Sequence, residues 1–243
     1  MKRILSLLLC IILITGTQVT PAFAAPEWPS NVSVEAEGAV LMDARSGAVI
    51  YGKNLHAVYY PASITKILTA LIVIEHCNLD DVVTFSHDAI YSVEQGSSSA
   101  GMDVGDQMTV RDCLYAMLLK SANEVANALA EHTAGSIQNF AVLMNAKARE
   151  LGCQESHFNN PSGLNDPQHY TSAYDMALIA QAAYDNETLV EISSATTHKI
   201  APTTQNPDGF TIRGEHRLCV TEDSSSPYYY PEAIAGKTGY LIK

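Results

Sequence analysis

Ser63 and Lys66 stand three residues apart at the start of an apolar stretch. On a helix this spacing places the hydroxyl and the ammonium on one face, within a turn of each other. A lysine withdrawn from water loses the solvation of its charged form, so its pKa falls and the neutral amine can take a proton from serine. Ser63 would then be a nucleophile. The other interpretation is a helix-capping serine beside a lysine that extends to solvent, because S-x-x-K arises by chance roughly once in a chain of this length.

Two further polar clusters follow along the chain. Ser121 and Asn123 interrupt a helical region rich in leucine and alanine, and we expect a short loop here because residues two apart do not share a helix face. Lys237, Thr238 and Gly239 lie in a β-rich stretch in which glycines flank the Lys-Thr pair. Glycine weakens a strand and commonly marks a close approach to the backbone, here by a substrate lying antiparallel to the strand. Taken singly, the first cluster is typical of caps and turns, and the second fits a solvated edge strand equally well.

Hydrophobic patterning predicts the elements that hold these clusters. From Ile67 to Ile74 the apolar residues run almost without a break, which indicates a helix over 61–76 that is buried on most sides. Before it, two β-rich runs predict an antiparallel hairpin of 39–42 and 48–51, and after it a polar, glycine-rich stretch over 78–109 predicts surface loops. Further helices are expected over 110–119, 125–134, 137–151 and 173–184, and strands over 197–200, 210–213 and 233–242. This order predicts an α+β domain with an inserted helical block at about residues 80–190.

The N-terminal segment has the pattern of an export signal. A basic start at Lys2 and Arg3, a short apolar run as far as Ile14 and an A-x-A exit at Ala24 predict a cleaved signal peptide over 1–24, and the catalytic domain would then occupy 25–243. Removal of Lys2 and Arg3 takes the formal net charge from −12 to −14. So acidic a surface repels polyanions, and we do not expect nucleic acid as a partner.

Other common catalytic, cofactor-binding and metal-binding motifs are absent from the sequence. The chain contains no G-x-S-x-G, P-loop, G-x-G-x-x-G or H-E-x-x-H pattern. Beyond the signal, Cys77, Cys113, Cys153 and Cys219 are far apart and lack the Cys/His spacing of a metal site. We expect no metal and no cofactor, and the sequence leaves open whether these four thiols form disulfides.

The three clusters together, in the order S-x-x-K, S-x-N and K-T-G, are far rarer by chance than any one of them. The set resembles that of class A β-lactamases and penicillin-binding proteins. The surrounding sequence is similar to the serine-type D-Ala-D-Ala carboxypeptidases, which are low-molecular-mass penicillin-binding proteins, over roughly Ala39 to Tyr240. The segments that carry this likeness are P-A-S-I-T-K-I-L-T-A-L (61–71), L-L-K-S-A-N-E-V-A-N-A-L-A-E (118–131), M-N-A-K-A-R-E-L-G (144–152), F-N-N-P-S-G-L (158–164) and H-Y-T-S-A-Y-D-M-A-L-I-A (169–180). The resemblance implies a β-lactamase/transpeptidase-like fold, in which helices flank an antiparallel sheet and an all-helical subdomain is inserted.

The resemblance also implies the chemistry. Ser63 would attack the carbonyl between two terminal D-alanines and Lys66 would accept its proton, giving an acyl-enzyme that water later releases. Ser121 would relay a proton toward the departing D-alanine. Asn123 would bind the backbone amide of the substrate and help to hold Lys66.

The remaining implied roles concern substrate binding. Lys237, Thr238 and Gly239 would bind the substrate, with the ammonium and the Thr238 hydroxyl directed at its terminal carboxylate. The backbone N–H groups of Ser63 and Tyr240 would form the oxyanion hole. The implied ligands are a peptidoglycan stem peptide ending in D-Ala-D-Ala and β-lactam antibiotics, at the extracytoplasmic face of a bacterial membrane or cell wall.

The sequence departs from the family at its end and leaves two rival functions open. The chain stops at Lys243, so we expect the family's last two strands, its packing helix and any C-terminal membrane anchor to be missing from it. A class A-like β-lactamase is one rival, because Glu155 and Asn159 approach the E-x-x-L-N pattern of the deacylating glutamate. The other rival is a penicillin-binding or wall-binding fragment without turnover.

Overall fold

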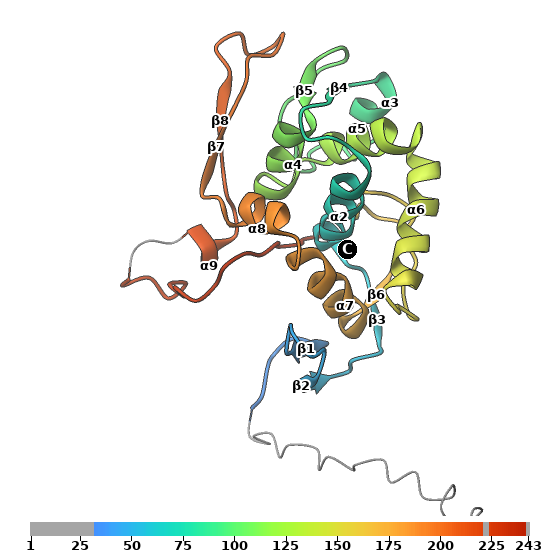
Figure 1. The fold of residues 1–243 in the computed structure, drawn as a ribbon, viewed down its shortest axis with the longest axis vertical. Coiled ribbons are helices and arrows are strands. Elements are labelled where there is room, and N and C mark those ends of the chain that lie inside the picture. Colours follow the sequence, from blue (N-terminus) through green and yellow to red (C-terminus); the bar gives the residue numbers. More distant parts are fainter. Residues whose placement is uncertain (1–31, 221–223, 242–243) are drawn as a thin grey trace, which may run out of the picture. The chain divides into compact units, whose positions relative to one another are not determined.

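The computed structural model describes residues 32–220 and 224–241, so the predicted signal peptide over 1–24 lies outside the described residues (Figure 1). All the elements named below belong to one unit, Val34–Lys243. In chain order they are β1 (Ala39–Met42), β2 (Val49–Lys53), β3 (Val58–Tyr59), the 3-10 turn η1 (Ala62–Thr65), α2 (Lys66–His76), β4 (Val82–Thr84), α3 (His87–Tyr91), β5 (Gln107–Thr109), α4 (Val110–Leu119), α5 (Asn123–Ala134), α6 (Ile137–Glu150), β6 (Thr171–Ser172), α7 (Ala173–Tyr184), α8 (Glu187–Ser194), β7 (Thr197–Ile200), β8 (Phe210–Arg213) and α9 (Arg217–Val220).

Helix α2 forms the centre of the helical part. It packs against α4, α5, α6, α7 and α8, which surround it in Figure 1. Every residue from Lys66 to Val73 is buried. The prediction of a helix buried on most sides is therefore confirmed, and a polar side chain at its first turn is withdrawn from water.

Side-chain caps explain where most of the other helices begin. Thr109, Ser136 and Ser172 precede α4, α6 and α7, and each hydroxyl accepts a hydrogen bond from the backbone N–H three residues later. Helix α5 differs, because its N-cap is Ala122, which has no capping side chain. Its start is therefore fixed by other contacts, which lie in the candidate active site.

The described strands form antiparallel pairs. Strand β1 pairs with β2, β4 with β5 and β7 with β8. The hairpin predicted from 39–42 and 48–51 is confirmed, with its second strand at Val49–Lys53, and so are the strands predicted over 197–200 and 210–213. Strand β3 pairs with β6, with Val58 opposite Ser172 and Tyr59 opposite Thr171. This long-range pair holds the segment that leads into η1 beside the start of α7.

Three predictions about local structure are wrong in part. The helix expected over 61–76 begins with a 3-10 turn, because Ala62 adopts a left-handed conformation with φ of 52° that an α-helix does not tolerate. The stretch 78–109, predicted as loops, contains β4, α3 and β5. The strand expected over 233–242 is not formed within its described part, 233–241, because no described strand pairs with it.

The four cysteines of the described residues, Cys77, Cys113, Cys153 and Cys219, are free thiols. Within the described ranges, no group of three or more His, Cys, Asp or Glu side chains is placed to hold a metal ion. A search of the same residues for a helix long and apolar enough to cross a membrane finds none.

Candidate active site

The Ser63–Lys66 pair lies on the turn that joins η1 to α2. In a 3-10 turn the side chains at i and i+3 eclipse each other, so the two polar groups come closer than on an α-helix. Lys66 Nζ is 3.0 Å from Ser63 Oγ. Ser63 is partly exposed, whereas Lys66 is fully buried. The predicted approach of amine to hydroxyl, and the predicted desolvation of the amine, are both present.

Two of the three oxygen atoms bonded to Lys66 Nζ can only accept hydrogen bonds. Its Nζ donates to Asn123 Oδ1 at 2.7 Å and to the Ser162 carbonyl at 2.6 Å. Burial lowers the pKa of Lys66 well below its usual value of 10.5, the positive charge of Lys237 lowers it further, and Glu124 opposes both effects. A neutral amine has two hydrogens and one lone pair. If the two hydrogens go to Asn123 and Ser162, the lone pair is left for the hydroxyl proton of Ser63.

The Ser121–Asn123 cluster spans the junction of α4 and α5, and the loop predicted for it is shorter than expected because α5 begins at Asn123 and not at Val125. Ser121 has a φ of 62°, which turns the chain between the two helices, and it is almost fully buried. Asn123 is the first residue of α5, and its backbone N–H donates to the Ser98 carbonyl at 2.9 Å. The loop therefore directs the Ser121 hydroxyl and the Asn123 amide toward the same region as Lys66.

Lys237 brings the third cluster to the same place. Its Nζ donates to Ser121 Oγ at 3.0 Å and to the Thr238 carbonyl at 2.7 Å. Burial lowers its pKa to about 8, and Glu215 partly opposes that shift. The amino group of Lys237 therefore contacts the second serine hydroxyl of the site.

Gly239 allows the third segment to pass directly beside Ser63. A Cβ atom at this position would lie 3.0 Å from the Pro61 carbonyl oxygen and 3.2 Å from the Ser63 backbone nitrogen. A cavity of about 280 Å³ is lined by residues of all three clusters: Ser63, Ser121, Asn123, Thr238, Gly239 and Tyr240. The Tyr240 side chain is 82% exposed. The oxyanion hole assigned to Ser63 and Tyr240 remains a prediction, since no hydrogen bond of the Tyr240 N–H is among the described contacts.

The loop 158–164 contributes contacts that sequence reasoning did not assign to the site. Asn160 Oδ1 accepts from the backbone N–H groups of Ser162 and Gly163 and from the Ser162 hydroxyl, which orients the Ser162 carbonyl toward Lys66. Gly163 has a φ of 82°, and a Cβ atom there would lie 1.8 Å from the Ala62 carbonyl oxygen. The sequence N-P-S-G predicts a turn. That this turn packs against the segment carrying Ser63 and Lys66 could not be inferred from the sequence.

His169 connects this loop to the turn that carries Ser63. Asn159 N–H donates to His169 Nδ1 at 3.2 Å, so the ring proton lies on Nε2, which is 2.9 Å from Thr65 Oγ1. Burial lowers the pKa of His169 to about 4. His169 is therefore a neutral structural link between two segments of the site.

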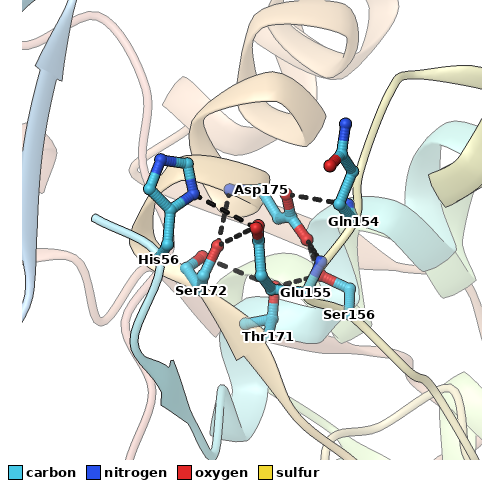
Figure 2. A network of polar contacts seen from close by, with 7 residues as sticks. All are labelled: His56, Gln154, Glu155, Ser156, Thr171, Ser172 and Asp175. Atoms are coloured by element: carbon cyan, nitrogen blue, oxygen red, sulfur yellow. Dashed lines mark hydrogen bonds and ion pairs between the residues drawn. The ribbon is translucent and has the colours of Figure 1, made fainter. Parts of the chain in front are cut away.

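Glu155, on which the lactamase interpretation depends, is held in a different network. Figure 2 shows its carboxylate directed at His56 and Ser172, with distances of 3.2 Å to His56 Nδ1 and 3.4 Å to Ser172 Oγ. In the same network Asp175 accepts from the backbone N–H groups of Gln154 and Glu155 and from the Ser156 hydroxyl, which fixes this turn to the start of α7. Glu155 is not among the residues that line the cavity with Ser63. A deacylating role for Glu155 has no geometric support.

Comparisons with known proteins point to one family. The sequence pattern of the family described as D-alanyl-D-alanine carboxypeptidase (Peptidase_S11) matches residues 24–228. The D-alanyl-D-alanine carboxypeptidase DacF of Bacillus subtilis is 34% identical over 99% of this chain. This chain spans 60% of the length of DacF, and less than two thirds of the other curated relatives compared.

Solved structures support the same assignment of the fold. A D-alanyl-D-alanine carboxypeptidase from Mycobacterium tuberculosis superposes with a TM-score of 0.77 at 29% identity, covering 88% of this chain and 78% of that one. A mutant of the Streptomyces K15 DD-transpeptidase superposes with a TM-score of 0.76 at 29% identity, covering 86% and 82%. The transpeptidase-like α+β fold expected from the sequence is confirmed. The chain belongs to the D-alanyl-D-alanine carboxypeptidase family.

Proposed function

We propose that the protein is a serine DD-carboxypeptidase that removes the terminal D-alanine from peptidoglycan stem peptides ending in D-Ala-D-Ala. The observation that carries this proposal is the buried Lys66 amine, 3.0 Å from Ser63 Oγ and otherwise bonded to two oxygen acceptors. That arrangement favours proton transfer from the hydroxyl to the amine. The family match supports the substrate class.

Acylation begins with the attack of Ser63 Oγ on the carbonyl carbon between the two D-alanines. The hydroxyl proton passes to Lys66 Nζ as the new C–O bond forms. The negative charge on the carbonyl oxygen is stabilised by the N–H groups of Ser63 and Tyr240, and the loss of one such donor costs about 3 kcal/mol of transition-state stabilisation. Ser121 relays the proton held by Lys66 to the nitrogen of the departing D-alanine as the C–N bond breaks: its own hydroxyl proton goes to the nitrogen, the Lys66 proton replaces it, and Lys66 is neutral again.

The substrate carboxylate determines which peptides the site accepts. Lys237 and the Thr238 hydroxyl bind the terminal carboxylate, and the Asn123 side-chain amide binds the preceding peptide group. Water then attacks the ester, which releases the shortened peptide and restores Ser63. A β-lactam acylates Ser63 by the same route, and its adduct persists because Glu155, the carboxylate that the sequence offered for deacylation, does not line the cavity with Ser63.

Export follows from this function, since stem peptides lie outside the cytoplasmic membrane. We propose that residues 1–24 direct export and are removed. N-terminal sequencing of the protein recovered from the producing cell tests this: a chain starting at about residue 25 supports it, and a chain that retains Met1 contradicts it.

The decisive experiment measures D-alanine released from a peptide ending in D-Ala-D-Ala by the full-length protein and by its Ser63→Ala variant. Release by the first and none by the second supports the carboxypeptidase. Incubation with penicillin, followed by mass spectrometry, separates the rivals. A stable adduct on Ser63 accompanies the carboxypeptidase, rapid hydrolysis of penicillin indicates a lactamase, and an adduct without D-alanine release indicates a binding protein. The absence of both reactions refutes acyl transfer.

A further inference from the structure

Glu124 is a buried carboxylate next to the active-site asparagine that the mechanism above does not use. It is 2% exposed and lies in the first turn of α5. Its Oε1 accepts from the Ser99 hydroxyl and from the Ala100 backbone N–H, both at 2.7 Å. Its Oε2 is buried and has no hydrogen-bond partner among the described residues. Burying a carboxylate with hydrogen bonds to only one of its oxygens costs folding free energy, so its presence at this position needs an explanation.

The hydrogen bonds of Glu124 fix one wall of the cavity. Ser97 and Ser98 line the cavity beside Ser63, and the Ser98 carbonyl accepts from the Asn123 backbone N–H. Glu124 holds the next two residues of this segment. Two consecutive residues at the start of α5 therefore tie residues 98–100, hereafter the wall segment, to the helix that also carries the Asn123 amide.

Glu124 also affects the charge state of the proposed base. Its negative charge raises the pKa of Lys66, whereas burial and the Lys237 ammonium lower it. Of the other nearby groups, His169 is held neutral, because burial lowers its pKa to about 4. Several charged groups on helices packed against α2 have partners away from the site: Asp112 with His198, Lys147 with Glu75 and Glu150, Glu191 with Arg111, and Asp175 with the turn 154–156. Glu94 and Glu215 line the cavity itself, and Glu215 pairs with Lys120. On α3, which packs against α5, His87 and Asp88 are exposed.

We propose that Glu124 is a positioning residue for acyl transfer. It holds the wall segment against α5 and supplies the negative charge opposite the positive charge that Lys66 acquires when it takes the proton of Ser63. This inference rests on the function proposed above. The physical reason is that a buried ammonium next to a second cation is strongly disfavoured unless an anion compensates it.

The test is the pH dependence of the acylation rate constant, measured with a fluorescent penicillin on the full-length protein. In the wild-type protein the rate rises with pH as Lys66 becomes neutral. Glu124→Gln keeps an oxygen acceptor for Ser99 and Ala100 but removes the charge. Without this negative charge the pKa of Lys66 is lower, so we expect the acylation rate of Glu124→Gln to rise at a lower pH than in the wild type. We also expect its maximal rate to be roughly tenfold lower, because a less basic amine is a weaker general base.

Two variants separate charge from structure. Ser99→Ala removes one hydrogen bond of the wall segment and keeps the charge, so we expect the rising limb to stay at the wild-type pH. Glu131→Gln removes a charge from the far end of the same helix and should change neither the limb nor the plateau. Of these three substitutions, only Glu124→Gln is expected to change the pH at which the acylation rate rises.

Several results would overturn the inference. A Glu124→Gln variant with a wild-type limb and plateau would do so, and so would an equal shift in Glu131→Gln, which would show a non-specific effect of net charge. Should Glu124→Gln fail to fold, Glu124→Asp replaces it: the charge is kept but the side chain is shorter, so the limb should stay and the plateau should fall. A shifted limb in Glu124→Asp contradicts the inference. A wild-type protein that no penicillin acylates at any pH would refute the proposed function as well.

Discussion

Asn123→Asp tests whether Lys66 must be neutral to act as the base. The substitution changes little in shape but places a carboxylate at the position of an amide oxygen that lies 2.7 Å from Lys66 Nζ. At that distance and an effective dielectric constant of about 20, the attraction between two unit charges is about 6 kcal/mol. Burying the new carboxylate takes back several kcal/mol of this. A net stabilisation of the ammonium by about 3 kcal/mol would raise the pKa of Lys66 by about two units, which lowers the population of neutral amine by up to about 100-fold at pH values below the wild-type pKa.

The assay is the rate of Ser63 acylation by penicillin, followed by mass spectrometry between pH 6 and 10. We expect the rising limb of Asn123→Asp to lie about two pH units above that of the wild type, so that the variant acylates up to about 100-fold more slowly on this limb and recovers as the pH rises, because deprotonation of Lys66 restores the base. Asn123→Ala is the matched control, since it removes the same hydrogen bond and adds no charge. Its rising limb should not move to higher pH.

A particular outcome would refute this reasoning. If Asn123→Asp acylates at the wild-type rate over the whole pH range, the neutral form of Lys66 is not what limits the reaction. The base would then have to be another group. If Asn123→Ala and Asn123→Asp are equally slow and equally dependent on pH, only the lost hydrogen bond matters and the electrostatic argument is wrong.

Three further predictions concern other contacts of the site. Gly163→Ala would place a Cβ atom 1.8 Å from the Ala62 carbonyl oxygen at a φ of 82°. We therefore expect the free energy of unfolding, measured by chemical denaturation, to fall by about 2–4 kcal/mol, together with slow acylation. An unfolding free energy equal to that of the wild type would contradict this. Because burial lowers the pKa of His169 from 6.5 to about 4, the unfolded chain binds more protons between these pH values, and the unfolding free energy should fall by about 3 kcal/mol as the pH drops from 6.5 to 4. His169→Gln should remove that part of the slope, and an unchanged slope would show that other groups cause it. Lys237 has a pKa of about 8, so its positive charge is lost as the pH rises through that value. The KM for a peptide with a terminal carboxylate should therefore rise above pH 8 in the wild type and stay constant in Lys237→Arg, because arginine stays charged. An equal rise of KM with pH in both proteins would contradict the role of this charge.

Most element types could be predicted from the sequence because periodicity and capping are local. Helix α4 and strands β7 and β8 have the predicted bounds, and α7 begins after Ser172 as expected from its capping chemistry. One failure has a local cause and the other a long-range cause. The left-handed Ala62 converts the first turn of the predicted helix into a 3-10 turn, and residues 233–241 lack a pairing partner, which a period-2 pattern cannot reveal.

The sequence by itself determined that Ser63 and Lys66 are one turn apart on a buried element, because both the spacing and the apolar run of α2 are short-range features. Only the tertiary structure decided what surrounds that pair. The oxygens bonded to Lys66 come from Asn123 and Ser162, 57 and 96 residues away, and the partner of Ser121 is Lys237, 116 residues away. Contacts over such separations depend on how whole helices and loops pack, and the residues that make them carry no local pattern that specifies one another.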